Sequence, residues 1–233
     1  MKTMKSLLAL CALLLASFAA SAANTYTYVG PNYDATIPFA GPCPAGSNCA
    51  NFTLAMNLDG QFSGAGRLPA NLPGVDITAN LTSFTFNDGL TTYSSADPQV
   101  RVYQFLVSTD ANGNITAVNI LIERFQAGGA GPHAPGDRFD FFQIVGAGTP
   151  TALHNFVCTA VGVSPGGTPD SCTGAVNDAG SSSASAAAAG AFALAAAAGP
   201  GIPTLGEYAL LLLAALMGIA GVYGVRRKGA TAA

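Results

Sequence analysis

The segment from Val100 to Phe125 alternates apolar and polar residues on both sides of Asn112-Gly113. Alternation with a period of two indicates half-buried strands, and Asn-Gly is the preferred pair for a two-residue type I′ hairpin turn. The same register places Arg101 opposite Arg124, an unfavourable pair that fraying or nearby carboxylates would have to relieve. The turn also predicts three facing apolar pairs on one side of an antiparallel ribbon: Val107 with Val118, Phe105 with Ile120 and Tyr103 with Ile122.

Shorter stretches with the same period lie elsewhere between residues 24 and 177. Phe52 to Met56 is one, and a second run from Val75 to Leu81 changes phase before Phe84, which predicts a bulge or break near Thr82-Ser83. Turn-forming residues separate these runs at 57–60, 87–89 and 110–114. Eight or nine short strands without a long internal helical pattern favour an all-β fold, an antiparallel β-sandwich large enough to bury a core.

Four cysteines lie in this domain: Cys43, Cys49, Cys158 and Cys172. An even number in an exported chain favours disulfides, and we expect Cys43–Cys49 and Cys158–Cys172 because each pair encloses a loop rich in Pro and Gly. Two other pairings remain open. A zinc site is a weaker alternative, since the spacings do not match paired metal-binding knuckles.

The N-terminus, residues 1–23, has the three parts of a secretory signal peptide. Lys2 and Lys5 precede an apolar run, and Ala22 and Ala23 offer two equally suitable cleavage positions. A permanent anchor is the alternative, although the run is short and ends in small residues. A lipoprotein signal at Cys11 is disfavoured because bulky Leu10 precedes it.

The C-terminus contains a predicted transmembrane helix at residues 208–225. This stretch has no charge, is long enough to span a bilayer, and is followed at once by Arg226, Arg227 and Lys228. By the positive-inside rule the basic cluster and the tail 229–233 stay cytoplasmic, which puts the preceding domain outside the inner membrane. A buried core helix is the alternative.

A short motif precedes this helix: Ile202, Pro203, Thr204 and Leu205, followed by Tyr208 and Ala209. With the apolar helix and the basic stop, residues 202–228 resemble IPTL-CTERM tails, a type of sorting signal of the exosortase class in Gram-negative bacteria. In that pattern Tyr208-Ala209 replaces a Trp-Gly pair. Pro203 favours an extended entry into a protease cleft, or simply starts the helix.

The resemblance implies a fate and a set of partners. It implies that an exosortase-like membrane protease recognises the tail, cuts near the motif, and passes the protein to an acceptor. The inner membrane would then be a transient anchor, and the final location the cell surface or the extracellular space. The domain, with its Asn/Asp-Gly turns and the segment 109–116, is similar to exported domains that carry such tails. An exopolysaccharide or another envelope component is a further possible partner.

Residues 178–201 are almost entirely Ser, Ala and Gly, and include Ser181, Ser182 and Ser183. Such a stretch buries little apolar surface, so it is predicted to be a linker between domain and tail. An alanine helix between residues 186 and 198 is the alternative.

The charge of the region between residues 24 and 200 excludes one class of function. The 233-residue chain has only 9 Lys and Arg and 12 Asp and Glu, and this region keeps four arginines against eleven carboxylates, a net charge near −7. A binder of nucleic acid or of anionic lipid needs the opposite sign.

No residue pattern identifies a catalytic site, and no cofactor or metal is expected. Asp110 to Asn114 resembles the start of a calcium loop, but Leu121 occupies the twelfth position, where a glutamate is required. Asp59 and Asp88 lie in similar turns. His133, in a loop, and His154, in an apolar stretch, are accompanied by no hydrolase motif.

Three hypotheses follow. The leading one is a non-enzymatic exported surface or matrix protein. The second is a carbohydrate- or calcium-dependent binding module that uses exposed tyrosine rings for stacking. The third is a hydrolase that depends on His133 or His154. The rings considered for the second are Tyr26, Tyr28, Tyr33 and Tyr93.

Overall fold

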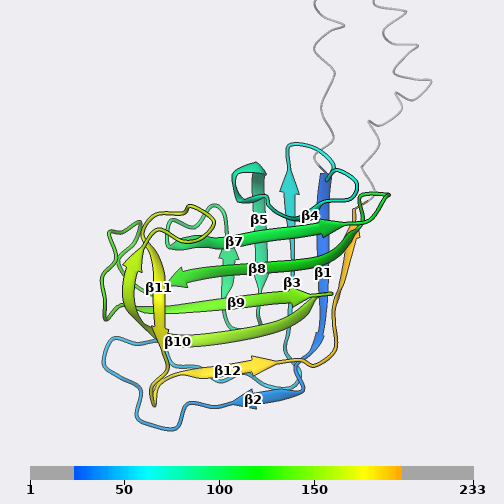
Figure 1. Ribbon diagram of the computed structural model, residues 1–233. Helices are drawn as coiled ribbons and strands as arrows, with labels where there is room; N and C mark the ends of the chain where they lie inside the picture. The colour runs from blue at the N-terminus through cyan, green and yellow to red at the C-terminus, as the bar shows by residue number, and fades with distance from the viewer. Residues whose placement is uncertain (1–23, 196–233) are drawn as a thin grey trace, which may run out of the picture. The chain divides into compact units, whose positions relative to one another are not determined.

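Two antiparallel sheets make up most of residues 24–195, the part of the chain that the computed structural model describes (Figure 1). No α-helix occurs in this part. The smaller sheet has five strands, in the spatial order β13 (Ala191–Leu194), β1 (Asn24–Asn32), β3 (Asn57–Gly64), β5 (Leu81–Asn87) and β6 (Thr92–Ser94).

The larger sheet has eight strands, of which seven follow one path and β11 (Ser171–Val176) pairs with β10 beside that path. The path runs through β2 (Ala35–Ile37), β12 (Ser182–Ser185), β10 (Thr149–Gly162), β9 (Arg138–Gly146), β8 (Ile115–Phe125), β7 (Val100–Thr109) and β4 (Pro73–Asp76).

The two sheets pack face to face with their strands crossing steeply. In Figure 1, β7 to β10 run across the view while β1, β3 and β5 run nearly at right angles behind them, which is the orthogonal type of sheet packing. Aromatic rings join the layers: Phe62 and Phe105 have centroids 4.8 Å apart, and Phe86 and Phe142 5.0 Å apart. The all-β antiparallel prediction is confirmed.

A second, smaller core lies on the outer face of the larger sheet. Alternate residues of β8 and β9 point away from the main core, and among them Phe125 and Phe139 are nevertheless buried. Cys158 and Cys172 complete this cluster. The loop between β8 and β9 and the β11 segment therefore cover one part of this face.

The β7–β8 hairpin confirms part of the predicted register. Val107 pairs with Val118 and Phe105 with Ile120, but Ile122 pairs with Val102, because a bulge between Val102 and Gln104 takes Tyr103 out of register. Beyond the bulge, Arg101 faces Glu123 and not Arg124. The extra residue thus removes the expected like-charge pair and places a carboxyl side chain opposite Arg101.

The turn of this hairpin differs from the predicted type I′. The carbonyl of Asp110 accepts the N–H of Gly113, and the N–H of Asp110 donates to the carbonyl of Asn114. Gly113 has φ +74°, whereas Asn112 is not left-handed. This is a type I turn followed by a glycine bulge, a three-residue hairpin loop.

The phase change near Thr82-Ser83 has two structural causes. The 3₁₀ turn η2 (Thr78–Asn80) separates β4, in the larger sheet, from β5, in the smaller one. In addition, the β3–β5 register shifts between Ser83 and Leu81, which leaves Thr82 as a bulge. The predicted bulge or break is confirmed.

The predicted linker at 178–201 is wrong for its described part. Residues 182–185 form β12, which lies between β10 and β2, and residues 191–194 form β13. Small side chains suit this position because Ala184 is buried against neighbours on both sides. The folded unit extends to Ala195, and no alanine helix forms between residues 186 and 195.

Several predictions concern residues outside the described range 24–195. They are the signal peptide at 1–23, the membrane helix at 208–225, the sorting motif with Tyr208, and the basic stop Arg226, Arg227 and Lys228. Within the described range, no helix is long and apolar enough to span a bilayer.

Candidate functional site

The four tyrosines proposed as exposed stacking rings are buried, and that prediction is wrong. Each is at most 2% exposed, because each points between the sheets. Tyr28 Oη donates to Gly148 O at 2.7 Å, Tyr33 Oη to Asp88 O at 3.0 Å and Tyr93 Oη to Asp88 Oδ2 at 2.9 Å. Tyr26 Oη instead accepts the N–H of Leu68 at 2.9 Å.

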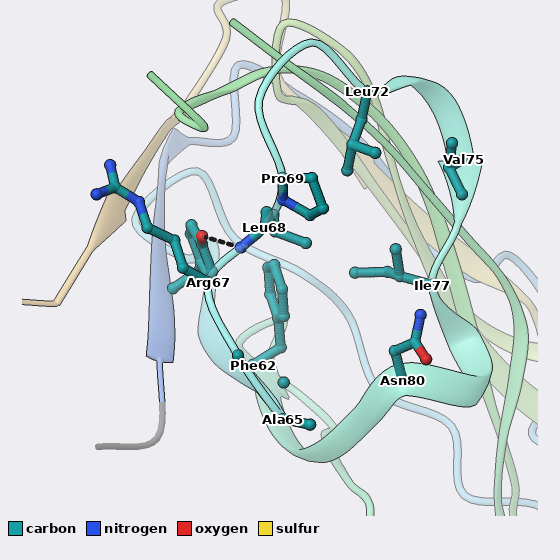
Figure 2. Close-up of a pocket in the computed structure, with 12 residues that line it drawn as sticks. Phe62, Ala65, Arg67, Leu68, Pro69, Leu72, Val75, Ile77 and Asn80 are labelled. Atoms are coloured by element: carbon teal, nitrogen blue, oxygen red, sulfur yellow. Dashed lines mark hydrogen bonds between the residues drawn. The ribbon is translucent and has the colours of Figure 1, made fainter. Parts of the chain in front are cut away.

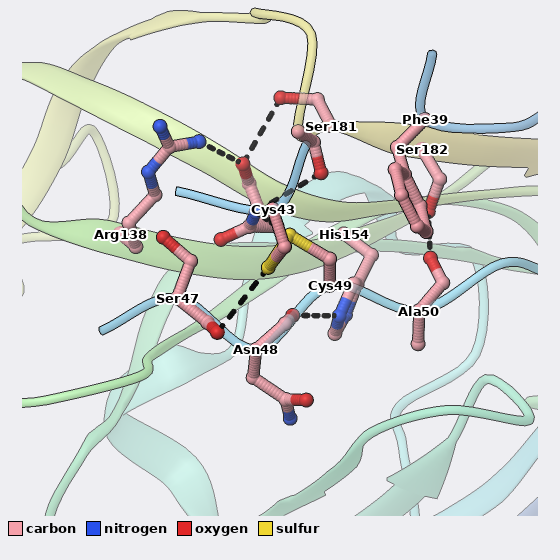
Figure 3. The surroundings of a disulfide bond; sticks show 12 residues. Phe39, Cys43, Ser47, Asn48, Cys49, Ala50, Arg138, His154, Ser181 and Ser182 are labelled. Atoms are coloured by element: carbon pink, nitrogen blue, oxygen red, sulfur yellow. Dashed lines mark hydrogen bonds between the residues drawn. A yellow bond between two sulfur atoms is a disulfide. The ribbon is translucent and has the colours of Figure 1, made fainter. Parts of the chain in front are cut away.

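Both predicted disulfides are present, Cys43–Cys49 and Cys158–Cys172. All four thiols are therefore consumed, and the zinc alternative is wrong. The first disulfide closes a short exposed loop (Figure 3), whereas the second joins β10 to β11 inside the smaller core. Each one lies beside a histidine–aspartate pair whose histidine is buried.

The first pair joins His154 on β10 to Asp140 on β9. His154 Nδ1 lies 2.9 Å from Asp140 Oδ1, at ion-pair distance but not aligned for a hydrogen bond. Asp140 Oδ1 also accepts Gln126 Nε2 and the N–H of Asn155, each at 2.8 Å, and Oδ2 accepts Thr91 Oγ1 at 2.9 Å. The aspartate is thus enclosed by donors.

Local backbone geometry produces this arrangement. The β9–β10 register shifts between Leu153 and Phe156, and Asn155 in that bulge has φ +61°. The bulge turns the Asn155 N–H toward Asp140, and its side chain donates to Gly180 O at 3.0 Å. A bulge thus converts part of a strand into a polar junction.

The Cys43–Cys49 loop covers the other side of His154. His154 Nε2 lies 2.6 Å from Asn48 O, and Asn155 Nδ2 donates to Cys49 Sγ at 3.2 Å. In Figure 3, the backbone carbonyl of Asn48 faces the ring of His154, and the Asn48 side chain points away from it. Both ring nitrogens of His154 are therefore occupied by protein atoms.

The charges of this junction are coupled. Burial lowers the pKa of His154, but the adjacent Asp140 carboxylate and the Asn48 carbonyl outweigh burial, so the net pKa is raised. Burial raises the pKa of Asp140, and His154, Asn155 and Gln126 outweigh it, so that pKa is lowered. The pair is stabilised in its charged form.

Asp88 extends the junction toward the smaller sheet. It is fully buried and accepts the N–H groups of Leu90 and Thr91 as well as Tyr93 Oη. Burial raises its pKa to about 6, against the effect of those donors. Its carboxylate is thus a structural part of the turn that enters β6.

The second pair joins His133, in the β8–β9 loop, to Asp170. The ring of His133 stacks on Phe125 with centroids 3.7 Å apart, and Nδ1 lies 2.7 Å from Asp170 Oδ2. Asp170 also accepts Arg101 Nη2 at 2.9 Å and the backbone N–H of His133 at 2.8 Å. This cluster fastens the loop to β7.

Glu123 lies beside this second cluster and is 1% exposed. It accepts the N–H of Cys172 at 2.8 Å. Burial raises its pKa to about 8, although Cys172, Ser171 and Arg101 act in the opposite direction. A carboxyl that is neutral at moderate pH therefore contacts the backbone of Cys172, a residue of the second disulfide.

Both histidines are buried. A histidine–aspartate pair works as a general base when the second ring nitrogen reaches a nucleophile. His133 Nε2 is buried and has no hydrogen-bond partner among the described residues, and His154 Nε2 contacts a backbone carbonyl. Both pairs therefore join segments of the fold.

In the calcium-like loop, both carboxylate oxygens of Asp110 accept hydrogen bonds within the turn. Asp110 Oδ1 accepts the N–H groups of Asn112 and Asn114, and Oδ2 accepts Asn114 Nδ2. These bonds lower the pKa of Asp110. Within residues 24–195, no group of three or more His, Cys, Asp or Glu residues is arranged to hold a metal ion.

One apolar pocket, of about 300 Å³, opens beside β3 and β4 (Figure 2). Its floor contains Phe62 and Ile77, and its wall is the loop with Leu68, Pro69 and Leu72. The guanidinium of Arg67 points away from this space in Figure 2 and donates to Asn112 O at 2.7 Å. The pocket therefore offers shape and apolar contact without a charged anchor.

Sequence reasoning missed the acids that matter in these clusters. Asp140, Asp170 and Glu123 carried no motif, and their partners are up to 69 residues away in sequence. Asp140 and Glu123 each have apolar neighbours in a predicted strand, and this was the sequence feature that could have indicated their burial. Their partners depend on bulges that composition does not show.

Comparison with known proteins identifies the tail. Residues 200–227 match the family model described as IPTL-CTERM motif, which confirms the resemblance seen at Ile202 to Leu205. No curated protein matches the chain, and no solved structure matches it.

Proposed function

We propose that this chain, which carries an IPTL-CTERM sorting signal, is a non-enzymatic protein of the cell surface or extracellular matrix. An exosortase-like membrane protease recognises the signal after export and cuts near it. The two-sheet domain is the part that remains outside the cell.

The observation that carries this proposal is the family match at residues 200–227. The matched segment includes the motif Ile202 to Leu205, an uncharged stretch of membrane-spanning length, and the basic residues Arg226 and Arg227. This order suits a signal that is held in the membrane by its helix and read just outside it.

The domain supports the proposal independently. Two disulfides suit an oxidising compartment outside the cytoplasm, where small exported domains commonly have them. Three of the four arginines between residues 24 and 195 form ion pairs that join segments: Arg101 with Asp170, Arg124 with Asp97, and Arg138 with Asp178. In these ion pairs the arginines stabilise the fold of the two-sheet domain and do not contact a substrate.

The test follows the full chain in its native host, with and without the gene for the sorting enzyme. An antibody against the two-sheet domain reports size and location. We expect a shortened, envelope-associated or released form when the enzyme is present, and a full-length inner-membrane form when it is absent.

Two proline variants test recognition of the signal. Pro203→Ala should slow the conversion, because proline favours the extended backbone that a protease cleft binds. Pro165→Ala, at an exposed position of the two-sheet domain and outside the matched segment, is the control and should be processed normally. A mature protein that still ends at Ala233 in cells with the enzyme would contradict the proposal.

A further inference from the structure

Asp140 bridges two side chains that come from different sheets. Its Oδ2 accepts Thr91 Oγ1 at 2.9 Å, and its Oδ1 accepts Gln126 Nε2 at 2.8 Å. Thr91 lies in the turn that enters β6 of the smaller sheet, and Gln126 directly follows β8 of the larger one. One carboxylate therefore holds a hydroxyl from one layer and a carboxamide from the other.

A hydroxyl and a carboxamide can react to form an ester and release ammonia. The hydroxyl must lose its proton to a base, and Thr91 Oγ1 already donates its proton to Asp140. This contact is shielded from water, since Thr91 is 7% exposed and Asp140 is 2% exposed. Asp140 is thus placed as the general base that activates a threonine nucleophile.

The nitrogen of the carboxamide must gain a proton before it leaves. His154 Nδ1 lies 2.9 Å from Asp140 Oδ1, the same oxygen that accepts Gln126 Nε2. His154 Nε2 lies 2.6 Å from Asn48 O, which suits a ring with a proton on each nitrogen, and the raised pKa of His154 favours that charged form. A proton donor therefore lies beside the nitrogen that departs.

The Cys43–Cys49 loop contacts the carboxamide as well. The N–H of Asn48 donates to Gln126 Oε1 at 3.2 Å, and Gln126 Nε2 donates to Asn48 O at 3.5 Å. A backbone N–H on a carbonyl oxygen stabilises the negative charge that develops there when a nucleophile adds. The Gln126 backbone is also fixed, because its N–H donates to Arg138 O at 2.9 Å.

We infer that Thr91 and Gln126 form an intramolecular ester bond that links the two sheets covalently. As Thr91 Oγ1 bonds to Gln126 Cδ, its proton passes to Asp140 Oδ2. The Cδ–Nε2 bond then breaks while Nε2 takes the proton of His154 Nδ1, and ammonia leaves. Asp140 returns its proton to His154. Hydroxyl and carboxamide thus become ester and ammonia, and no oxidant or reductant is needed.

The described arrangement is that of the reactants. Bond formation requires Thr91 Oγ1 to come within about 3 to 3.5 Å of Gln126 Cδ. Thr91 is fixed by its turn, since its N–H donates to Asp88 Oδ1 at 2.7 Å. Rotation of the Gln126 side chain about the shared carboxylate is the movement that remains. Placement within one folded chain supplies the high effective concentration that a weak nucleophile needs.

Peptide mapping of the full chain tests the bond. Trypsin cleavage of the denatured chain after its arginines puts Thr91 in peptide 68–101 and Gln126 in peptide 125–138, neither of which contains a cysteine. We expect a joined pair whose mass is the sum of both peptides less one ammonia molecule. Mild alkali should separate the pair by hydrolysis and leave a carboxylate on the side chain at position 126.

Variants assign the link to its groups. Thr91→Val removes the nucleophile and Asp140→Asn removes the base, so both should leave the peptides separate, whereas Thr91→Ser should keep the link. Thr92→Val, at an exposed neighbouring position on β6, is the matched control and should be linked like the unmodified chain.

Two results would overturn the inference. One is separate peptides of full mass from the unmodified chain with both disulfides formed, and the other is a link that persists in Thr91→Val. The ester forms within the two-sheet domain whether or not the tail is processed. Either result therefore leaves the proposed function intact.

Discussion

Glu123 accepts the backbone N–H of Cys172, a residue of the second disulfide, at 2.8 Å. This contact joins the central strand β8 to β11, and it does so with a carboxyl that is 1% exposed. Arg101 is the facing residue on β7, and the charge of Asp170 helps to raise the Glu123 pKa. The protonation state of one side chain therefore affects how firmly the outer segment is held.

Stability should fall as pH rises above the ordinary range of a carboxyl. Burial raises the Glu123 pKa from 4.5 to about 8, so the folded state favours the neutral form and loses stability as pH rises between those values. Asp88, raised to about 6, and His154, also raised, act in the same direction. Below pH 4 the lowered pKa values of Asp140 and Asp170 reverse the trend.

The variant Glu123→Gln isolates the contribution of Glu123 to this pH dependence. It keeps an acceptor for Cys172 without a charge, and we expect unfolding free energies that decline less between pH 5 and pH 8, by on the order of 3 kcal/mol. Denaturant titrations at several pH values measure this. Asp59→Asn, on an exposed position of β3, is the control. Equal slopes for Glu123→Gln and the wild type would show that Glu123 is ionised without cost.

The alanine-rich segment contains a matched pair of positions. Ala184 is 3% exposed between Ala152 and Thr36, whereas Ala188 is exposed in the loop that follows. Ala184→Asp should cost about 3 kcal/mol or more, because it buries an unpaired charge, and Ala188→Asp should be nearly neutral. Thermal unfolding distinguishes them. Similar melting temperatures would mean that this segment is a linker after all.

The two disulfides should contribute unequally. Cys158–Cys172 spans 14 residues in a buried cluster, and Cys43–Cys49 spans 6 in an exposed loop. In the chain-entropy model, replacing the pairs with serine costs about 3 and about 2 kcal/mol, and buried serines add to the first value. Denaturant unfolding of the two double variants is the measurement. A larger loss from the Cys43–Cys49 pair would contradict this ranking and point to the His154 junction as the more important one.

Gly113 should resist substitution, unlike a nearby glycine. It has φ +74°, and a Cβ there would lie 2.7 Å from Leu68 O. Gly113→Ala should therefore destabilise the domain by about 1 to 2 kcal/mol or more. Gly66 has a conventional φ and open space around its Cβ position, so Gly66→Ala is expected to be near neutral. A neutral Gly113→Ala would mean that the turn changes type at no cost.

The β7–β8 hairpin shows which structural features a local sequence pattern can predict. Alternation and Asn112-Gly113 predicted the strands and the pairs nearest the turn, because those depend on residues close in sequence. The bulge at Tyr103 was not predictable, since it depends on what packs across the sheets. It also decides that Arg101 faces Glu123.

The burial of the tyrosines also has a part that local pattern predicts and a part that depends on tertiary packing. Tyr26 and Tyr28 alternate with polar neighbours, which is consistent with an inner face, but only the crossing of the two sheets shows that both are covered. The Ser/Ala segment was wrongly predicted to be a linker for a related reason. Its small side chains carry little apolar signal, yet they fit where β12 lies between two other strands.

The sequence by itself determined the all-β class and the sorting signal, because each depends on local periodicity or a contiguous motif. It favoured the two cysteine pairs that form, because each encloses a short loop. Only the tertiary structure decided where the domain ends and which acids are buried. Those features come from contacts between segments far apart in the chain, such as Thr25 with Ala195 and Thr91 with Asp140. Such contacts form only when distant strands have paired or the two sheets have packed, and no local pattern specifies them.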